Sequence, residues 1–294
     1  MSENQDPRTQ FVAEELPEQE QEVPGHDWQM DPAPDHGEDT YRGSGKLEGR
    51  RALITGGDSG IGRAVAIAFA REGADVLINY LEAEEADAQE TVRLVEDAGR
   101  KCVAYPGDIR NEQTCGEIVD AAVSELGGLD VLVLNAAFQM AQGGGLQDFT
   151  TEQIDRVFKT NVYSMFWICK AALPHLAPGS SIITTSSIEA YEPAPPLLDY
   201  AASKAAVLNL TKGLSQLLAP QGIRVNTVAP GPIWTPLIPA TMPPDKVSSF
   251  GQDTPLGRAG QPAEVAPAYD FLASTDSSYV TGERIGVAGG RTMP

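Results

Sequence analysis

The sequence predicts an α/β fold in which a doubly wound (Rossmann) parallel sheet is covered by helices on both faces. Short runs that are apolar throughout alternate with longer stretches in which apolar residues recur at helical spacing. This alternation is typical of parallel strands buried between two helical layers. The length of 294 residues and the hydrophobic fraction of 41% suit one domain of about 250 residues with an additional tail.

The predicted strands and helices alternate from residue 50 onward, and several of them end at glycine, as helices and strands often do. We expect strands at 50–55, 75–80, 101–108, 129–137, 180–187, 223–230 and 284–290. We expect helices at 62–74, 114–127, 151–176 and 200–219, and a Glu/Ala-rich helix that ends at Gly99. Sheets of this kind bind ligands at the carboxyl ends of their strands, so the residues that end strands are the candidates for a site.

Residues 1–45 form an N-terminal extension whose composition differs from that of the domain at 46–294. The extension holds twelve Asp and Glu against two Arg, and five prolines interrupt it. Such a composition is typical of a disordered leader. Several apolar residues favour partial docking as an arm instead, because tryptophan is costly to leave in water. These possible anchors are Phe11, Val12, Leu16, Trp28, Met30 and Tyr41.

Composition also limits the partners and the compartment. A net charge of −20 repels nucleic acid and anionic membranes. The chain shows no signal peptide and no apolar run of the ~18 residues that a membrane span requires. Three cysteines without a CxxC pair fit a reducing cytoplasm. The histidines, at 26, 36 and 175, lack metal-ligand spacing, so we expect no metal site.

The octet TGGDSGIG at 55–62 has two possible functions. Its centre, GDSG, surrounds the nucleophilic serine of trypsin-like proteases, but the whole octet also matches a glycine-rich turn that binds phosphate. It follows an apolar strand and opens an amphipathic helix, as a phosphate-binding turn must. The protease interpretation lacks a histidine placed as a base, and Ile61 stands where the second glycine of a G-x-S-x-G elbow would fall. We therefore favour the nucleotide-binding turn.

Polar residues follow other strands in the same way. Asp108 ends the third strand, and Asn135-Ala136-Ala137 ends the fourth, where small residues suit a flat ring or a ribose. Ser187 ends the fifth strand, and Tyr200 and Lys204 lie one turn apart on the next helix. A lysine ammonium there would favour the phenolate and make Tyr200 a usable proton carrier. An ordinary surface pair on a helix is the alternative.

With these residues in place, positions 46 to 290 resemble the short-chain dehydrogenase/reductase family. The octet fits the family's TGxxxGxG, and PGPIWTP at 230–236 is similar to the stretch that contacts nicotinamide. The acidic extension and the GGDSGIGRA loop resemble a bacterial subgroup that includes general-stress oxidoreductases. The chain departs from the family at Leu134 and Ala137, where Asn and Gly are common, and at Ala288, where Asp is common.

The resemblance implies specific roles. Tyr200 would be the general acid/base and Lys204 would lower its pKa and hold the nicotinamide ribose. Ser187 would bind the substrate oxygen, and Asn161 would position a water that relays protons. Glu189 and Tyr191 would join Ser187 and Tyr200 around the substrate. Coenzyme contacts are implied for Gly56, Asp58, Ser59, Gly60, Ile61, Gly62, Asn79, Tyr80, Asp108, Ile109, Asn135, Ala136, Ala137, Tyr200, Lys204, Pro230, Gly231, Ile233 and Thr235.

The expected function is therefore NAD(P)-dependent hydride transfer to or from a small aldehyde, ketone, sugar or secondary alcohol. NAD is favoured over NADP because Glu82, Glu84 and Glu85 would repel a 2′-phosphate, although Arg63 could offset them. The proline-rich loop 233–255 would cover the substrate. The resemblance also implies a homotetramer paired through the helices at 151–176 and 200–219. A cofactor-binding stress or scaffold protein with vestigial catalysis remains the alternative.

Overall fold

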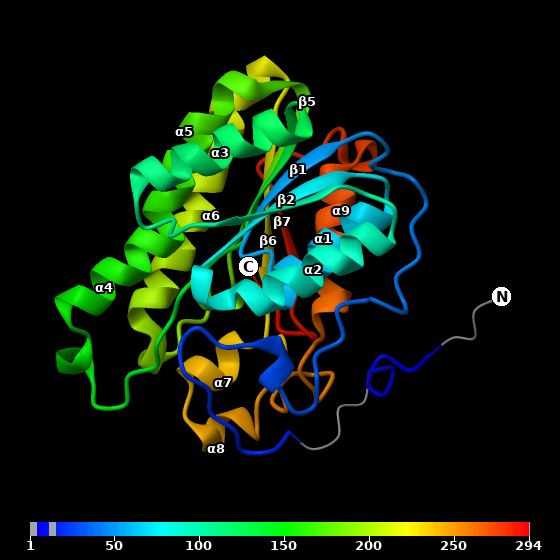
Figure 1. Cartoon of the computed structure of the whole chain (residues 1–294). Coiled ribbons are helices and arrows are strands. Elements are labelled where there is room, and N and C mark those ends of the chain that lie inside the picture. Colours follow the sequence, from blue (N-terminus) through cyan, green and yellow to red (C-terminus); the bar gives the residue numbers. More distant parts are fainter. Residues whose placement is uncertain (1–4, 12–15, 294) are drawn as a thin grey trace.

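The computed structural model describes residues 5–11 and 16–293, and its centre is a seven-stranded sheet between two helical layers (Figure 1). All strand pairs are parallel, in the order β3-β2-β1-β4-β5-β6-β7. The predicted doubly wound fold is confirmed. The strands are β1 Arg51–Thr55, β2 Asp75–Tyr80, β3 Cys102–Pro106, β4 Leu129–Leu134, β5 Leu176–Thr185, β6 Arg224–Pro230 and β7 Arg284–Val287.

The chain order reverses between β1 and β4, so the carboxyl ends of these two strands border the crevice where doubly wound sheets bind ligands. The longer helices that connect the strands are α1 Gly60–Arg71, α2 Glu85–Asp97, α3 Glu112–Leu126, α4 Thr151–Phe158, α5 Ser164–Ala172, α6 Leu198–Leu218 and α9 Pro262–Ala273. Figure 1 shows α1, α2 and α9 on one side of the sheet and α3, α5 and α6 on the other.

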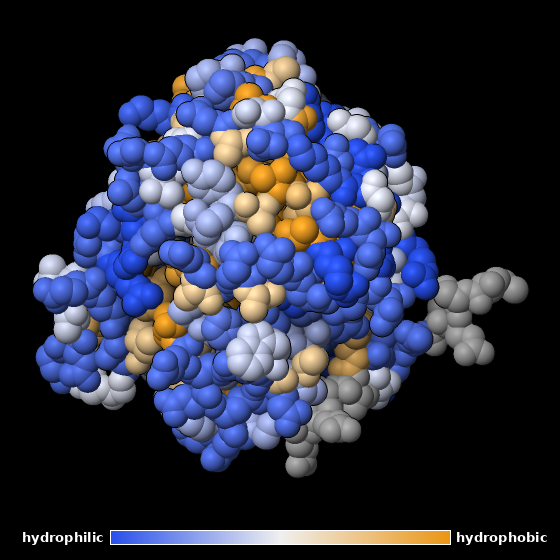
Figure 2. All heavy atoms as spheres, in the orientation of Figure 1, coloured by the Kyte–Doolittle hydropathy of each residue, from blue (hydrophilic) through white to orange (hydrophobic). Residues whose placement is uncertain are grey.

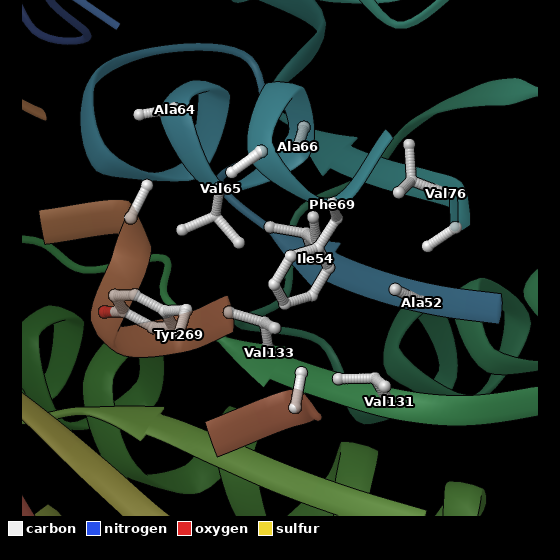
Figure 3. Close-up of a cluster of buried hydrophobic side chains, with 14 of the residues drawn as sticks. Ala52, Ile54, Ala64, Val65, Ala66, Phe69, Val76, Val131, Val133 and Tyr269 are labelled. Carbon is white, nitrogen blue, oxygen red and sulfur yellow. The ribbon is translucent and has the colours of Figure 1, made fainter. Parts of the chain in front are cut away.

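Alternation along each strand produces the two cores, because successive side chains point to opposite faces. Ala52 and Ile54 of β1 pack in a cluster with Phe69 of α1 and Tyr269 of α9 (Figure 3). Leu53, between them in sequence, belongs to a second cluster formed with α3, α5 and α6. Both faces of the sheet are therefore buried from solvent, which explains why its strands are apolar throughout.

Three segments differ from the sequence-based expectations. The single helix predicted at 151–176 is α4, a π-helical segment at Lys159–Tyr163 and α5, and Leu176 already begins β5. Helix α9 was not predicted, since Pro267 interrupts its pattern, although Pro262 at its first turn is a typical helix start. The predicted loop 233–255 contains two short helices, α7 Leu237–Thr241 and α8 Pro244–Val247.

The described part of the N-terminal extension lies against the domain. Met30 is buried in a third cluster with Trp234, Ile238 and Val247, and Tyr41 donates a hydrogen bond from its hydroxyl to Glu72 Oε1 at 2.8 Å. Trp28 is 67% exposed, and Val12 lies outside the described residues. Figure 2 shows a mostly hydrophilic surface on this side, with apolar residues in small groups. Within the described ranges, no helix has the length and apolar character needed to cross a membrane.

Candidate active site

The glycine-rich turn between β1 and α1 is held in a shape that excludes side chains. Gly56 and Gly60 have φ angles of +62° and +49°, which favour glycine. A Cβ atom on Gly62 would lie 1.7 Å from the carbonyl oxygen of Gly56, and one on Gly57 would lie 2.6 Å from Ile78. The backbone of this turn therefore stays bare next to the first turn of α1, where N–H groups favour an anion.

Hydrogen bonds tie this turn to the neighbouring strand ends. Thr55 Oγ1 accepts from the backbone N–H groups of Asn135 and Ala136 at 3.0 and 3.1 Å. The amide of Asn135 donates to the carbonyl of Gly56 at 3.1 Å, and the amide of Asn79 donates to the carbonyl of Gly107 at 2.9 Å. The ends of β1, β2 and β4 thus form one rim, which is what the strand-end argument predicts.

A cavity of about 900 Å³ opens at this rim. Twenty of the residues that the sequence singled out line it: Gly56, Asp58, Ser59, Gly60, Ile61, Asn79, Tyr80, Asp108, Ile109, Asn135, Ala136, Ala137, Ser187, Glu189, Tyr200, Lys204, Pro230, Gly231, Ile233 and Thr235. Such a volume suits a ligand of dinucleotide size with room for a small substrate.

Three of the singled-out residues do not line this cavity. Gly62 lies behind the turn, against the carbonyl of Gly56. Tyr191 packs its ring below the guanidinium of Arg284, 5.0 Å from ring centroid to Cζ, instead of forming the cavity floor. Asn161 is fully buried in the π-helical segment, where its amide donates to Ser203 Oγ at 2.9 Å and its Oδ1 accepts from the Phe138 N–H at 2.8 Å.

Helix α6 and the end of β5 bring the hydroxyl and amine groups together. Tyr200 and Lys204 lie on one face of α6, and Ser187 follows β5. Lys204 Nζ donates to the carbonyl of Thr185 at 2.8 Å and lies 5.5 Å from the centroid of the Tyr200 ring. The hydroxyls of Ser187 and Tyr200 interact, and this hydrogen bond favours the phenolate. A proton carrier, a hydroxyl and an amine therefore share one wall.

Burial opposes the ionisation of this set. It raises the pKa of the Tyr200 phenol, and this effect outweighs the opposite effect of Ser187. It also lowers the pKa of Lys204 to about 7, because the ammonium is removed from water. Lys204, whose ammonium the sequence analysis expected to favour the phenolate of Tyr200, is thus itself only partly charged near pH 7.

At the opposite end of the cavity, carboxyl groups gather near the end of β2. Asp58 is buried, and its Oδ2 has no hydrogen-bond partner within the part of the chain that the structure describes. Burial raises the pKa of Asp58 to about 7 and, together with Asp58, that of Glu84 to about 8. An unpaired buried carboxyl oxygen on a cavity wall is an acceptor that a ribose hydroxyl can satisfy.

Arg63 offsets these carboxyl groups only in part, because it stabilises the charged form of Asp58 but is also paired with other carboxylates. Its side chain is 7% exposed, and its guanidinium lies 3.1 Å from Asp27 Oδ2 and 3.0 Å from Asp87 Oδ1. The charge is therefore already paired inside the protein. Asp108 is paired as well, because its Oδ2 accepts from Arg110 Nε at 2.9 Å.

Sequence reasoning missed part of the cavity wall. Val23, Pro24 and Gly25 line it from the N-terminal extension, and Gln139 lines it after β4. The extension has no regular period, so nothing in its pattern indicated where it would lie.

Fold and site define the class of protein. A family model described as enoyl-(acyl carrier protein) reductase matches residues 56–292, and the chain belongs to the short-chain dehydrogenase/reductase family. It is an oxidoreductase of that family. The predicted family resemblance is confirmed.

Particular relatives resemble it along nearly the whole chain. It is 55% identical to an uncharacterized oxidoreductase, YghA, of Escherichia coli K12, over 100% of both chains. It is 52% identical to general stress protein 39 of Bacillus subtilis, over 94% of this chain and 96% of that one. It is 44% identical to a glucose and ribitol dehydrogenase of Daucus carota, over 93% and 96%.

A solved structure gives the same fold. The short-chain dehydrogenase of Burkholderia cenocepacia J2315, in complex with NADP, is 34% identical, with a TM-score of 0.77. The match covers 83% of this chain and 98% of that one. About a sixth of this chain therefore has no counterpart there.

Proposed function

We propose that the protein is an NAD(P)-dependent oxidoreductase that interconverts a carbonyl and an alcohol, with Tyr200 as the proton carrier. The observation that carries the proposal is that Tyr200, Ser187 and Lys204 line the same cavity as the glycine-rich turn. The bare turn and the unpaired Asp58 oxygen are the features that fit a dinucleotide. When bound, the nicotinamide coenzyme would supply or accept the hydride.

The side chains of the protein would then handle the proton and the developing charge. Ser187 and Tyr200 would bind the substrate oxygen through their hydroxyls. Tyr200 would donate its proton in the reducing direction and accept one in the oxidising direction. Lys204, held by the carbonyl of Thr185, would stabilise the phenolate and bind ribose hydroxyls. Asn161 remains our candidate for positioning a relay water, and its bond to Ser203 fixes its side chain.

For the substrate we propose a small polar carbonyl or alcohol, such as an aldehyde, a sugar or a polyol. The cavity wall beyond Ser187 carries Gln139, Glu189 and Arg291 among apolar residues such as Phe138 and Leu237. Amide and carboxyl groups are suited to bind several hydroxyls. The carrot relative, whose name includes glucose and ribitol, supports testing this class first.

We propose that NAD is the better coenzyme. Asp58 and Glu84 lie beside the end of β2, where the adenine ribose is expected, and Arg63 is already paired with Asp27 and Asp87. Carboxyl groups accept hydrogen bonds from a ribose 2′-hydroxyl and repel a 2′-phosphate. The Burkholderia structure contains NADP, so both coenzymes belong in the test.

We also propose a homotetramer. Apolar side chains remain exposed on the outer helices, with Phe166 at 53%, Tyr163 at 45% and Leu217 at 64% exposure. They lie on α5, on the π-helical segment before it and on α6, for which the family resemblance implies subunit pairing. Burying such residues between subunits is favourable.

The substitution Tyr200→Phe tests the catalytic proposal. It removes only the hydroxyl, so it should lower kcat by about 10²–10⁴-fold while the Kd for NADH stays near the wild-type value. Tyr191→Phe is the matched control, because Tyr191 lies against Arg284 and not on the cavity wall. Turnover would be followed by the absorbance of reduced nicotinamide with aldehydes, sugars and polyols. Turnover retained in Tyr200→Phe would assign the proton transfer elsewhere.

The same substrate screen distinguishes the proposed enzyme from the alternative, a coenzyme-binding protein without catalysis. If the wild-type protein binds NADH but turns over none of these substrates, a coenzyme-binding stress or scaffold role becomes the better proposal. The raised pKa of Tyr200 favours this alternative, since an unionised phenol is a poor base.

A further inference from the structure

The N-terminal segment 16–36, which we call the arm, passes along the mouth of the coenzyme cavity. Val23, Pro24 and Gly25 line the cavity on the side of the glycine-rich turn. The backbone N–H of Gln21 donates to the carbonyl of Pro239 at 3.0 Å. A Cβ atom on Gly25 would lie 2.4 Å from the carbonyl oxygen of Pro236, so the two backbones are in direct contact. Figure 1 shows the blue N-terminal segment beside α7 and α8.

Asp27 fixes the arm to the first turn of α1. Its side chain is 4% exposed, and its Oδ2 accepts a hydrogen bond from the backbone N–H of Gly60 at 3.2 Å. The same oxygen lies 3.1 Å from Arg63 Nη1 and 3.1 Å from His36 Nε2. A buried carboxylate thus joins the arm, at Asp27 and His36, to the glycine-rich turn. Burying these charges is costly unless they remain paired, so the contact is specific.

A second set of contacts continues the arm on both sides of Asp27. His26 Nδ1 lies 2.8 Å from Asp87 Oδ2 of α2, and Asp87 also binds Arg63. Trp234 is fully buried and donates from Nε1 to the carbonyl of Pro32 at 2.8 Å. The arm therefore connects α2, the glycine-rich turn and the segment after β6 that carries Thr235.

The arm lies outside residues 56–292, the part of the chain that the family model matches. About a sixth of this chain is not covered by the Burkholderia structure, which itself is covered to 98%, whereas the Escherichia coli relative matches over 100% of both chains. Nothing in the proposed catalytic step requires the arm, because Ser187, Tyr200 and Lys204 all belong to β5 and α6 or follow them directly.

We propose that the arm is a built-in clasp of the coenzyme site, in which Val23–Gly25 forms the outer wall over the glycine-rich turn and Asp27 is the residue that positions it. The inference rests on the proposed coenzyme binding. It predicts that the arm slows the exchange of the dinucleotide and binds more firmly when the dinucleotide is present. Asp27 occupies the N–H of Gly60, which leaves the following N–H groups of α1 to the diphosphate.

The first test compares Asp27→Asn with Asp130→Asn. Asn keeps the size and one acceptor oxygen of Asp but loses the ion pairs with Arg63 and His36. Asp130 forms a partly buried ion pair with Arg51, at 2.7 Å between Asp130 Oδ2 and Arg51 Nε, at the start of β1 and β4 and away from the cavity. It therefore controls for a general loss of stability.

The measurement is the release of NADH from the full-length protein, followed by stopped-flow fluorescence while excess NAD⁺ displaces it. We expect Asp27→Asn to release NADH about tenfold faster, which corresponds to about 1.4 kcal/mol. Asp130→Asn should release it at the wild-type rate. Hydrogen exchange should show that NADH protects peptides from 16–36 in the wild type and in Asp130→Asn, and less so in Asp27→Asn.

A second pair of variants keeps the charges intact, in case Asp27→Asn does not fold. Gly25→Ala pushes the arm away from the carbonyl of Pro236, whereas Gly43→Ala meets the carbonyl of Arg71 at 1.9 Å, a similar clash at the other end of α1. Only Gly25→Ala should speed up NADH release. Equal rates for both alanine variants, or an unchanged rate in both Asp27→Asn and Gly25→Ala, would overturn the clasp.

This result is distinguishable from failure of the proposed function. The wild-type protein is first titrated with NADH and NADPH, with fluorescence as the readout. If it binds neither, both the proposed function and the clasp are wrong. If it binds either one and the arm variants behave as the wild type does, only the clasp is wrong.

Discussion

The carboxyl groups of Asp58 and Glu84 should make the choice between NAD and NADP depend on pH. Burial raises the pKa of Asp58 to about 7, and burial and the neighbouring Asp58 raise that of Glu84 to about 8. Both residues line the cavity beside the end of β2. As the pH rises from 6.5 to 9, both carboxyl groups lose their protons, and negative charge appears where a 2′-phosphate would bind.

The expected size follows from the charges. One ionised carboxylate at about 6 Å from a doubly charged phosphate costs about 3–6 kcal/mol at an effective dielectric constant of about 20–40. This corresponds to a loss of NADPH affinity of about a hundredfold or more between pH 6.5 and 9. The phosphate itself stays largely dianionic in this range, since its second pKa is about 6. NADH lacks the 2′-phosphate, so its affinity should change much less.

The assay is a fluorescence titration of the wild type, Asp58→Asn and Glu84→Gln with NADH and NADPH at pH 6.5 and pH 9. Each substitution removes one of the two titrating groups, so each should flatten the pH dependence of the NADPH Kd. Asp58→Asn should also improve NADPH binding at pH 9. A ratio of the two Kd values that is constant with pH, or NADPH binding that tightens as the pH rises, would refute the electrostatic reasoning.

The same groups affect stability with a defined sign. A carboxyl group whose pKa is raised by folding keeps its proton in the folded protein at pH values where the unfolded chain has lost it. For Asp58 this window runs from the ordinary pKa of an aspartate, 3.8, to about 7. Across it, the contribution of Asp58 to the free energy of unfolding falls as the pH rises, and Asp58→Asn should remove that part of the slope.

Two further predictions concern packing. Trp234→Ala removes a fully buried indole and its hydrogen bond to the carbonyl of Pro32. Urea denaturation should therefore show a free energy of unfolding that is lower by about 3–5 kcal/mol. A loss below about 1 kcal/mol would contradict this account of the packing. Phe166→Glu places a charge on the exposed face of α5, so light scattering should show a smaller assembly than the tetramer that we propose for the wild type. A mass equal to that of the wild type would place the subunit contact elsewhere.

The fold was predictable because the strands are buried on both faces. Runs such as 75–80 and 129–134 show no polar alternation, and helical spacing follows each of them. The predicted boundaries of helices were wrong where the local sequence preference and the tertiary structure disagree. Helix α9 tolerates Pro267, and the π-helical segment at Lys159–Tyr163 interrupts a helix whose pattern is continuous in sequence. A π-helical turn has no distinct apolar period, and such turns are common at functional sites.

The residues of the candidate site were predictable for a different reason. Parallel strands end at one edge, so Asp108, Asn135 and Ser187 had to lie along the same edge of the sheet once their strands were identified. The arm follows no such rule. The positions of Asp27 and His36 depend on Arg63, more than twenty-five residues further along, and on charges that become strong only after burial. No local pattern encodes that pairing.

The geometry of α6 changes the argument for Tyr200. Spacing alone suggested that an ammonium one turn away would lower the pKa of the phenol. In the structure, Lys204 lies beside the ring at 5.5 Å, but burial raises the pKa of Tyr200 and lowers that of Lys204 to about 7. Above that pH the lysine loses its charge and its influence on the phenol. Ionisation of Tyr200 then requires another positive charge within the same cavity. Proton transfer by Tyr200 therefore depends on a cation that binds in this cavity.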